Sequence, residues 1–354
     1  MTVARRAPRL LLISMYPLDQ GVWGATQRIR QLRDELARRT RLDVIHGYRG
    51  PRRMALARYA ASGRLRGLDG IYVENSTMLP SETDVAFLAL ARALGIPVLT
   101  YLRDAQQLFD EYYPLSSVKR RLSRRLFLPA MRALMAVSTR VAFPSAGLAR
   151  AILGAEAECA LLLPPGSRRP VDVPLEPTAP SLLFVGGLRF PVQGGDILFE
   201  AIERARADGH PVELICVSRP HEEPPRPHPR WLHVQRAMGE EIDHLLPAVR
   251  ASITPRRRSP YNDLAVPIKV LEYLSYARPL IVTDCTEQAA IVRSTGSGVV
   301  VEDSADGLAR GITEVFSAPP AQVEAWSVAA RRAAEENSWA RRAGHVLEIL
   351  GLEP

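Results

Sequence analysis

Short apolar runs alternate with helical patterns along most of this chain. Ala25–Arg38 predicts a helix, because Ile29, Leu32 and Leu36 recur on one face while arginines occupy the other. Further helical stretches follow near residues 82–94, 117–136 and 146–153. The runs between them predict strands at Arg9–Met15, Leu42–His46, Gly70–Val73, Pro97–Leu102, Arg140–Phe143 and Cys159–Leu163. Strands that are apolar throughout, each followed by a helix, indicate a parallel sheet covered on both faces.

A proline-dense stretch at residues 164–180 interrupts this alternation and predicts a stiff, extended connector. The pattern then restarts, with helices from Gly195, at 239–247, at 266–277 and on to the end. The strands predicted here are Leu182–Val185, Glu213–Val217, Ala251–Thr254, Leu280–Thr283 and Gly298–Val301. We therefore predict an α/β fold of two doubly wound parallel-sheet domains. Their predicted limits are 1–168 and 181–325, with a linker at 169–180 and C-terminal helices at 326–354.

Composition agrees with a folded globular protein, since 47% of the 354 residues are hydrophobic and 24% are charged. No run approaches the ~20 apolar residues that cross a bilayer, and the apolar stretch at residues 10–15 is too short for a secretory signal. Cys159, Cys216 and Cys285 lie far apart beside apolar runs, so we expect small core residues in a reducing cytoplasm. The net charge of +8 points to an anionic partner, which leaves nucleic acid, anionic lipid and nucleotide phosphates open.

The strand-to-helix turns are the expected ligand sites, because doubly wound sheets bind ligands beyond the carboxyl ends of their strands. In the first turn, Tyr16–Gly24, the glycines Gly21 and Gly24 allow close approach of a ligand, and the following helix offers free amides to an anion. Their spacing does not match the dinucleotide fingerprint. A plain strand-helix turn explains this segment equally well.

The second domain opens with a glycine-rich turn, Phe184–Asp196, which contains four glycines and Arg189. Backbone amides and one guanidinium suit a pyrophosphate group. The alternative is a glycine-rich turn with a solvated arginine.

The stretch Tyr261–Thr283 carries the most specific pattern. A polar loop leads to Pro267 at the start of a predicted helix of three turns, which runs directly into a strand. Glu272 lies within this largely apolar helix, where a carboxylate requires a partner. A ribose diol and a neighbouring arginine are both suitable partners.

The segment P-x-K-x-x-E-Y-L followed by R-P-L-I-V-T resembles the donor-binding signature of the family-4 retaining glycosyltransferases. Other segments resemble that family in the same order, over nearly the whole chain: the first glycine turn, V-A-F-P-S-A-G-L at 141–148, L-P-P-G at 163–166, F-V-G-G-L at 184–188 and N-S-W at 337–339. The resemblance implies a GT-B fold, with two Rossmann-like domains facing across a cleft. The N-terminal domain would face the acceptor, the C-terminal domain would bind a nucleotide-sugar, and the last helices would cross back to the first domain.

The resemblance also implies donor-binding residues in the second domain. Glu272 would bind the ribose, and the turn with Gly186, Gly187, Gln193 and its neighbours would face the pyrophosphate. Residues Asn262, Asp263 and on to Val266 would present backbone amides to the sugar or phosphates. The remaining donor-binding candidates are Gly21, Gly24, Arg189 and Lys269.

Three positions depart from the family pattern. Leu264 stands where the family usually has a second glutamate, and Gly187 and Gln193 stand where it has an arginine and a lysine. We hypothesise that Arg189 replaces the arginine and that Lys269 supplies the lost cation. Arg189, Lys269 and Asp104 are thus the catalytic candidates.

Acceptor-side candidates come from the first domain. Asp104 ends the fourth predicted strand, where relatives often carry an acid or a histidine, and a helix N-cap or an ion pair with Arg103 is the alternative. Glu74 is a weaker candidate, and Ser145 lies in the segment at 141–148. The seven histidines form no metal set, so we expect a metal-independent reaction without a cofactor other than the nucleotide-sugar.

The resemblance implies transfer of a hexosyl or deoxyhexosyl group with retention at the anomeric carbon, in which the departing diphosphate takes the acceptor proton. The acceptor stays open between a cell-surface glycan, a lipid-linked glycan and a secondary metabolite. A non-catalytic nucleotide-sugar-binding or scaffold protein of the same fold is the main alternative. An epimerase of this fold would need paired carboxylates that the sequence does not show.

A basic amphipathic segment lies at Lys119–Phe127. Val118, Leu122 and Leu126 share one face, among five cations at positions 119, 120, 121, 124 and 125. Such a helix can rest on an anionic bilayer, which predicts peripheral contact with the inner membrane face. Packing of the apolar stripe on the core is the alternative that we favour. Aromatic residues are not interleaved with the cations, as a nucleic-acid platform would require.

Overall fold

The computed structural model of the protein describes residues 6–19, 24–75, 78–177, 180–188, 193–219, 222 and 227–352. The chain divides into two compact units. The first unit comprises Met1–Pro165 together with Trp339–Pro354, and the second unit comprises Gly166–Ser338. The proline-dense stretch thus belongs to the second unit from Gly166 onward. Its backbone packs there, because the amide of Val171 donates to the carbonyl of Ser275 at 2.8 Å.

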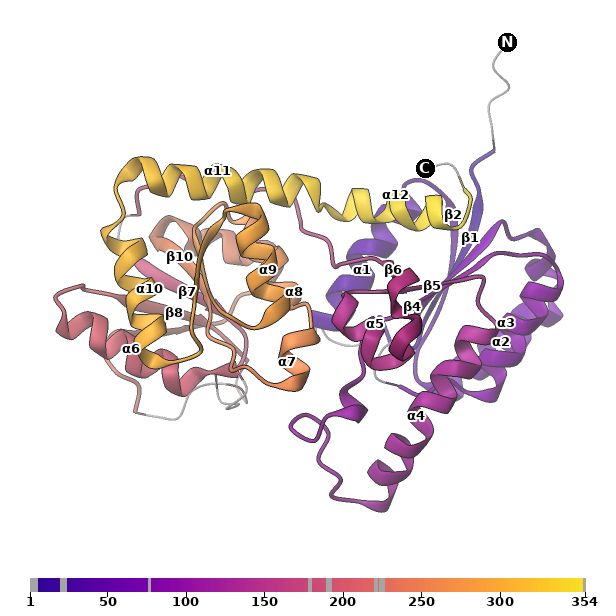
Figure 1. Ribbon diagram of the computed structural model, residues 1–354. Helices are drawn as coiled ribbons and strands as arrows, with labels where there is room; N and C mark the ends of the chain where they lie inside the picture. The colour runs from indigo at the N-terminus through magenta and orange to yellow at the C-terminus, as the bar shows by residue number, and fades with distance from the viewer. Residues whose placement is uncertain are drawn as a thin grey trace, which may run out of the picture. The chain divides into compact units, whose positions relative to one another are not determined.

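A six-stranded parallel sheet with the order β2-β1-β3-β4-β5-β6 forms the first unit (Figure 1). Its strands are β1 (Arg9–Ser14), β2 (Arg41–His46), β3 (Gly70–Asn75), β4 (Val98–Leu102), β5 (Arg140–Phe143) and β6 (Leu161–Leu162). Its α-helices are α1 (Gly24–Ala37), α2 (Arg49–Ala61), α3 (Glu82–Ala93), α4 (Val118–Ala136), α5 (Ala146–Leu153) and α12 (Trp339–Ile349). Short 3₁₀ helices are η1 (Arg64–Gly67), η2 (Gln106–Leu108) and η3 (Gly154–Cys159).

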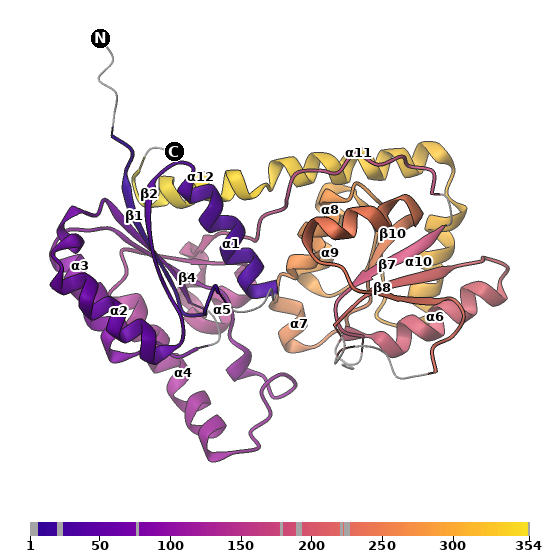
Figure 2. The same cartoon turned by 180° about the vertical axis from the view of Figure 1, so that it is seen from behind.

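Both faces of this sheet are covered (Figure 2). Leu10 and Leu12 of β1 pack with Ile29 of α1 and Val346 of α12. Since successive side chains of a strand point to opposite faces, the intervening Leu11 lies on the other face, and it is fully buried. Continuous apolar strands therefore fold as the parallel, doubly covered sheet that their pattern predicts.

The second unit repeats this plan with a parallel sheet of order β12-β11-β10-β7-β8-β9. Its strands are β7 (Ser181–Val185), β8 (Glu213–Val217), β9 (Leu232–Gln235), β10 (Val249–Thr254), β11 (Leu280–Thr283) and β12 (Gly298–Val301). Its helices are α6 (Gly195–Ala207), η6 (Gly239–Ala248), α7 (Pro260–Leu264), α8 (Ile268–Ser275), α9 (Thr286–Thr295), α10 (Ala305–Ser317) and α11 (Pro320–Glu336).

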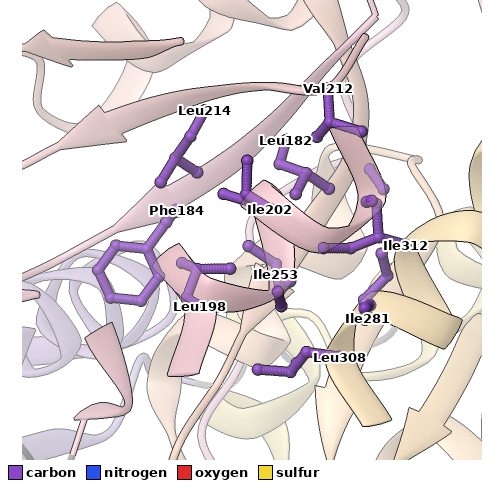
Figure 3. Close-up of a cluster of buried hydrophobic side chains, with 14 of the residues drawn as sticks. Leu182, Phe184, Leu198, Ile202, Val212, Leu214, Ile253, Ile281, Leu308 and Ile312 are labelled. Atoms are coloured by element: carbon purple, nitrogen blue, oxygen red, sulfur yellow. The ribbon is translucent and has the colours of Figure 1, made fainter. Parts of the chain in front are cut away.

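Two hydrophobic clusters cover the two faces of this second sheet. On one face, Leu182 and Phe184 of β7 pack with Ile202 of α6 and Leu308 of α10 (Figure 3). On the other face, Leu183 packs with residues of α8, α9 and α11, which are Val270, Leu271, Leu274, Val292 and Ala330. The predicted fold class, two doubly wound α/β units with parallel sheets, is confirmed.

Several local elements differ from the sequence prediction. The helices α2, α7 and α9 and the edge strand β9 were not expected, and residues 239–248 form a 3₁₀ helix. Cys216 and Cys285 are buried as predicted, whereas Cys159 is exposed at the end of η3. Among the described residues, no helix combines the length and the apolar character that crossing a bilayer requires.

Candidate functional site

The strand order of the second unit places a topological switch point between β7 and β10. The chain proceeds from β7 to β8 and β9 on one side, and from β10 to β11 and β12 on the other. Open α/β sheets bind ligands beyond the carboxyl ends of the strands at such a point. The turn after Val185 and the loop after Thr254 both start at this edge, so the candidate site is built from them and from the start of α8.

Lys269, in the first turn of α8, brings a cation to this edge. Its ammonium nitrogen lies 3.4 Å from the side-chain oxygen of Gln193 and 4.4 Å from the ring centroid of Phe184. Gly186 has a φ of +132°, and a Cβ at this position would stand 3.1 Å from the same nitrogen. Gly186 therefore accommodates both a left-handed backbone turn and the close approach of the lysine. The structure thus brings together Gly186, Gln193 and Lys269, three of the residues predicted from sequence.

A second cation, Arg256, lies beside Lys269. Burial of the ammonium group, together with the positive charge of Arg256, lowers the pKa of Lys269 to about 7, against an ordinary value of 10.5. The negative charges of Glu222 and Glu272 act in the opposite direction without restoring it. Two neighbouring cations of this kind form an electrostatic setting that an anion would stabilise.

Arg256 is a functional candidate that our sequence reasoning missed. It is 5% exposed, its guanidinium donates to Oδ1 of Asn262, and it donates to the carbonyl of Ala265 at 3.3 Å. Asn262 is fully buried, and its Nδ2 donates to the carbonyl of Arg257 at 2.7 Å. The one available signal was the run of three arginines, 256–258, directly after a predicted strand. Asn262 acts on this site by holding Arg256.

The expected amide donors of residues 262–266 require a correction. The amide of Asn262 donates to Oγ of Ser259 at 3.1 Å, and the amide of Asp263 donates to the carbonyl of Ser259 at 2.9 Å. The amide of Ala265 donates to the carbonyl of Tyr261 at 3.1 Å. These groups are used within α7 because the segment coils into a short helix that the sequence pattern did not reveal.

Asp263 and Val266 also have structural partners. The carboxylate of Asp263 forms an ion pair with Arg258 at 3.0 Å and accepts from the amide of Thr286 at 3.0 Å, which joins α7 to the start of α9. Val266 is half-buried and packs against the core cluster beneath α8.

The glycines of the turn before α6 are needed for close packing. A Cβ at Gly194, which has a φ of +73°, would stand 1.7 Å from the carbonyl oxygen of Pro255. A Cβ at Gly195 would stand 2.2 Å from the carbonyl oxygen of Leu188. At Gly187 it would stand 3.1 Å from the side chain of Glu222. Gly194 and Gly195 thus let the N-terminus of α6 pack against the loops that follow β10 and β7, and Gly187 leaves room for Glu222.

Glu272 lies one turn after Lys269 on α8 and is half-buried. Its charge acts on Lys269, Arg168 and Tyr276. The charge of Glu272 thus reaches Arg168, whose guanidinium is bonded to Asp243 at 3.1 Å. Of the remaining donor candidates, Gly24 begins α1, and Gly21 and Arg189 lie outside the described residues.

The acceptor-side candidates all lie in the first unit and have local bonds. Glu74 is fully buried at the end of β3, where it pairs with Arg28 at 2.9 Å and accepts from the hydroxyl of Tyr72. Oδ1 of Asp104 accepts from the amide of Gln106 at 3.2 Å. Oγ of Ser145 accepts from the amide of Leu148 at 3.1 Å and caps α5. These bonds account for the residues structurally, and their roles toward an acceptor stay predictions.

Within the described ranges, no group of three or more histidine, cysteine or acidic residues is placed to hold a metal ion. The charged side chains described at the switch point are the cations Lys269 and Arg256, with Glu272 acting on Lys269.

The two doubly wound parallel sheets of this chain match those of solved proteins that have the GT-B fold. Sucrose-phosphate synthase from Thermosynechococcus elongatus matches 97% of this chain and 98% of its own, with a TM-score of 0.63 and 15% identity. Anabaena HepE in complex with UDP and glucose matches 96% and 99%, with a TM-score of 0.64 and 15% identity. A glycosyltransferase from Rickettsia africae matches 98% of both chains, with a TM-score of 0.65 and 13% identity.

The family match is narrower and lies in the second unit. Residues 179–318 match the family model described as Glycosyl transferases group 1. This match and the similar solved structures confirm the resemblance to glycosyltransferases drawn from the sequence. Comparison with curated protein sequences gives no match.

Proposed function

We propose that this protein is a retaining glycosyltransferase that moves a hexosyl or deoxyhexosyl group from a nucleotide-diphosphate sugar to an acceptor. The observation that carries the proposal is the pair of cations Lys269 and Arg256 at the switch point of a glycosyltransferase domain. Their mutual repulsion is relieved when a diphosphate binds beside them. Among the solved structures of similar fold, HepE holds UDP and glucose, which makes UDP-glucose the first donor to test.

Each residue of the site has a proposed role. Lys269 and Arg256 bind the diphosphate, Gly186 leaves room for its oxygens, and Glu272 accepts hydrogen bonds from the ribose hydroxyls. Arg189 belongs to the same turn and is proposed to add a further contact.

The proposed reaction needs no nucleophilic side chain. The bond between the anomeric carbon and the diphosphate oxygen breaks, a bond to the acceptor oxygen forms on the same face, and the acceptor proton passes to the departing diphosphate. The ammonium of Lys269 stabilises the charge that builds on the leaving group, so catalysis rests on positioning and electrostatics. A glycan, a lipid-linked glycan or a small metabolite serves as acceptor, and we propose the cytoplasm as the compartment, without a metal cofactor.

Release of free nucleotide from UDP-, GDP- and dTDP-sugars tests the proposal, because a transferase hydrolyses its donor slowly even without its acceptor. We expect one donor to be turned over, and Lys269→Met to weaken its binding about ten- to a hundredfold, as expected for loss of a hydrogen bond to a charged group. Lys119→Met, at an exposed site in the first unit, is the matched control. Tight binding without any turnover would support a non-catalytic binding protein, and absence of both binding and turnover would refute the site.

A further inference from the structure

The helix α4 exposes an apolar stripe to solvent. Val118, Leu122 and Leu126 follow one another at intervals of one helical turn and are 70%, 54% and 45% exposed. The side chains that anchor α4 are buried and lie on the opposite face, namely Phe127, Met131 and Leu134. Our expectation that the stripe packs on the core is therefore wrong. Figures 1 and 2 show the N-terminal turns of α4 extending away from the sheet of the first unit.

Exposed cations flank this stripe. Lys119, Arg121, Arg125 and Arg132 are all exposed, and α4 contains no acidic residue along Val118–Ala136. Within the ranges that the structure describes, none of these four side chains forms a salt bridge. Their positive charge is therefore left without a protein partner beside an apolar surface.

Arg120 and Arg124, the other two cations of the basic segment Lys119–Phe127, have bonds within the protein. Arg124 bonds to Asp110 and donates to the carbonyl of Leu108 at 3.0 Å, and Arg120 donates to the carbonyl of Pro114 at 3.1 Å. These bonds fix the preceding segment to α4, with Ser117 capping the helix at the amide of Arg120. The exposed face is thus carried by a helix whose N-terminal end is held in place.

We propose that α4 docks this protein on anionic lipid bilayers. An interfacial helix combines aliphatic side chains that enter the acyl boundary with cations that meet lipid headgroups, and α4 has both on its solvent face. Single-stranded nucleic acid is a poorer fit, because its binding sites offer exposed aromatic side chains for stacking, and Phe127, the aromatic residue of α4, is fully buried. Docking through one short stripe is reversible, and it presents the first unit to acceptors carried by the membrane.

Vesicle flotation of the full-length protein tests this proposal. We expect it to float with vesicles of phosphatidylcholine mixed with phosphatidylglycerol, and not with phosphatidylcholine alone. Arg121→Gln with Arg125→Gln should weaken binding by about fivefold for each cation removed. Leu122→Ser with Leu126→Ser should also reduce it, whereas each variant should keep the affinity for nucleotide, because the candidate donor site lies in the second unit.

Two control variants separate a local surface from overall composition. Arg310→Gln with Arg332→Gln removes the same charge from exposed sites of the second unit, and Val328→Ser removes a comparable exposed side chain from α11. Both should bind vesicles as the parent protein does. The proposal would be overturned if the parent protein did not float with anionic vesicles or if the α4 substitutions left its binding unchanged. It would also be overturned if the control variants lost as much binding as the α4 variants. Concentration-dependent self-association abolished by the leucine substitutions, without vesicle binding, would instead assign the stripe to a protein contact.

Discussion

The ammonium nitrogen of Lys269 and the side-chain oxygen of Gln193 lie 3.4 Å apart, although 75 residues separate them in the chain. The family-4 pattern usually has a lysine at the position that Gln193 occupies. In this chain, the ammonium group of Lys269 on α8 lies beside the side chain at position 193. We propose that Lys269 supplies the positive charge that position 193 lacks.

Stability should depend on pH through Lys269. Its pKa is lowered to about 7 in the folded protein, against 10.5 ordinarily, so between these values the unfolded chain binds more protons than the folded one. The contribution of this group to the free energy of unfolding therefore rises with pH across that window and is lowest below it. Urea unfolding of the parent and of Lys269→Met should show this slope in the parent alone. If the free energy of unfolding changed with pH in the same way in both proteins, the pKa of Lys269 would not be lowered in the folded protein.

Asn262→Ala should weaken donor binding although Asn262 is expected to act only through Arg256. The substitution removes one acceptor of the Arg256 guanidinium, which keeps its bond to the carbonyl of Ala265, and it leaves the carbonyl of Arg257 without its donor. The expected cost is about 2 kcal/mol of unfolding free energy. Asp263→Ala is the matched control on the same helix. It breaks a partly exposed ion pair worth about 0.5 kcal/mol and also removes the acceptor of the Thr286 amide. Calorimetric titration with nucleotide checks the affinity. Equal affinities for Asn262→Ala and the parent would show that Arg256 does not contact the donor.

Gly194→Ala should destabilise the second unit strongly for two reasons. The new Cβ would clash with the carbonyl oxygen of Pro255, and alanine is strained at a φ of +73°. Gly209→Ala is the matched control, since Gly209 has a φ of +91° and open space around the added Cβ. The control isolates backbone strain, about 1–2 kcal/mol. We expect Gly194→Ala to cost clearly more in urea unfolding. A similar cost for both would mean that the loop shifts easily, and that the packing of α6 on Pro255 is not required.

Glu74→Gln separates a structural from an acceptor-side role. It leaves Arg28, which is 1% exposed, without its counter-charge, and loss of one partner of a buried ion pair costs about 3–5 kcal/mol. The guanidinium of Arg28 lies 4.0 Å from the ring centroid of Tyr101 and 5.5 Å from that of Trp339, so the pair also ties α1 to β4 and α12. Arg28→Met in the same chain should restore part of the stability. An unchanged free energy of unfolding with impaired transfer would favour the acceptor role.

The described strands other than β9 could be predicted from the sequence because they are apolar runs between turns, as Glu213–Val217 and Leu280–Thr283 show. Helix α2 could not, because its arginines leave the apolar positions Leu56 and Tyr59 isolated in the pattern. At the site, Gly186, Lys269 and Glu272 followed from the motif. Arg256 did not, because which of three consecutive arginines is buried depends on Asn262, a contact formed only in the folded unit. The exposure of Leu122 likewise depends on which face of α4 meets the core.

Titration of Lys269 with and without nucleotide tests the central claim most directly. The chain contains only two lysines, Lys119 and Lys269, so selective ¹³C labelling of lysine gives two side-chain signals, and Lys119 serves as an internal control. We predict that Lys269 titrates with a pKa of about 7 in the free protein, and that UDP moves this pKa well upward while Lys119 is unaffected. A pKa of Lys269 that does not change at saturating UDP, GDP or dTDP would contradict a diphosphate site at this cation.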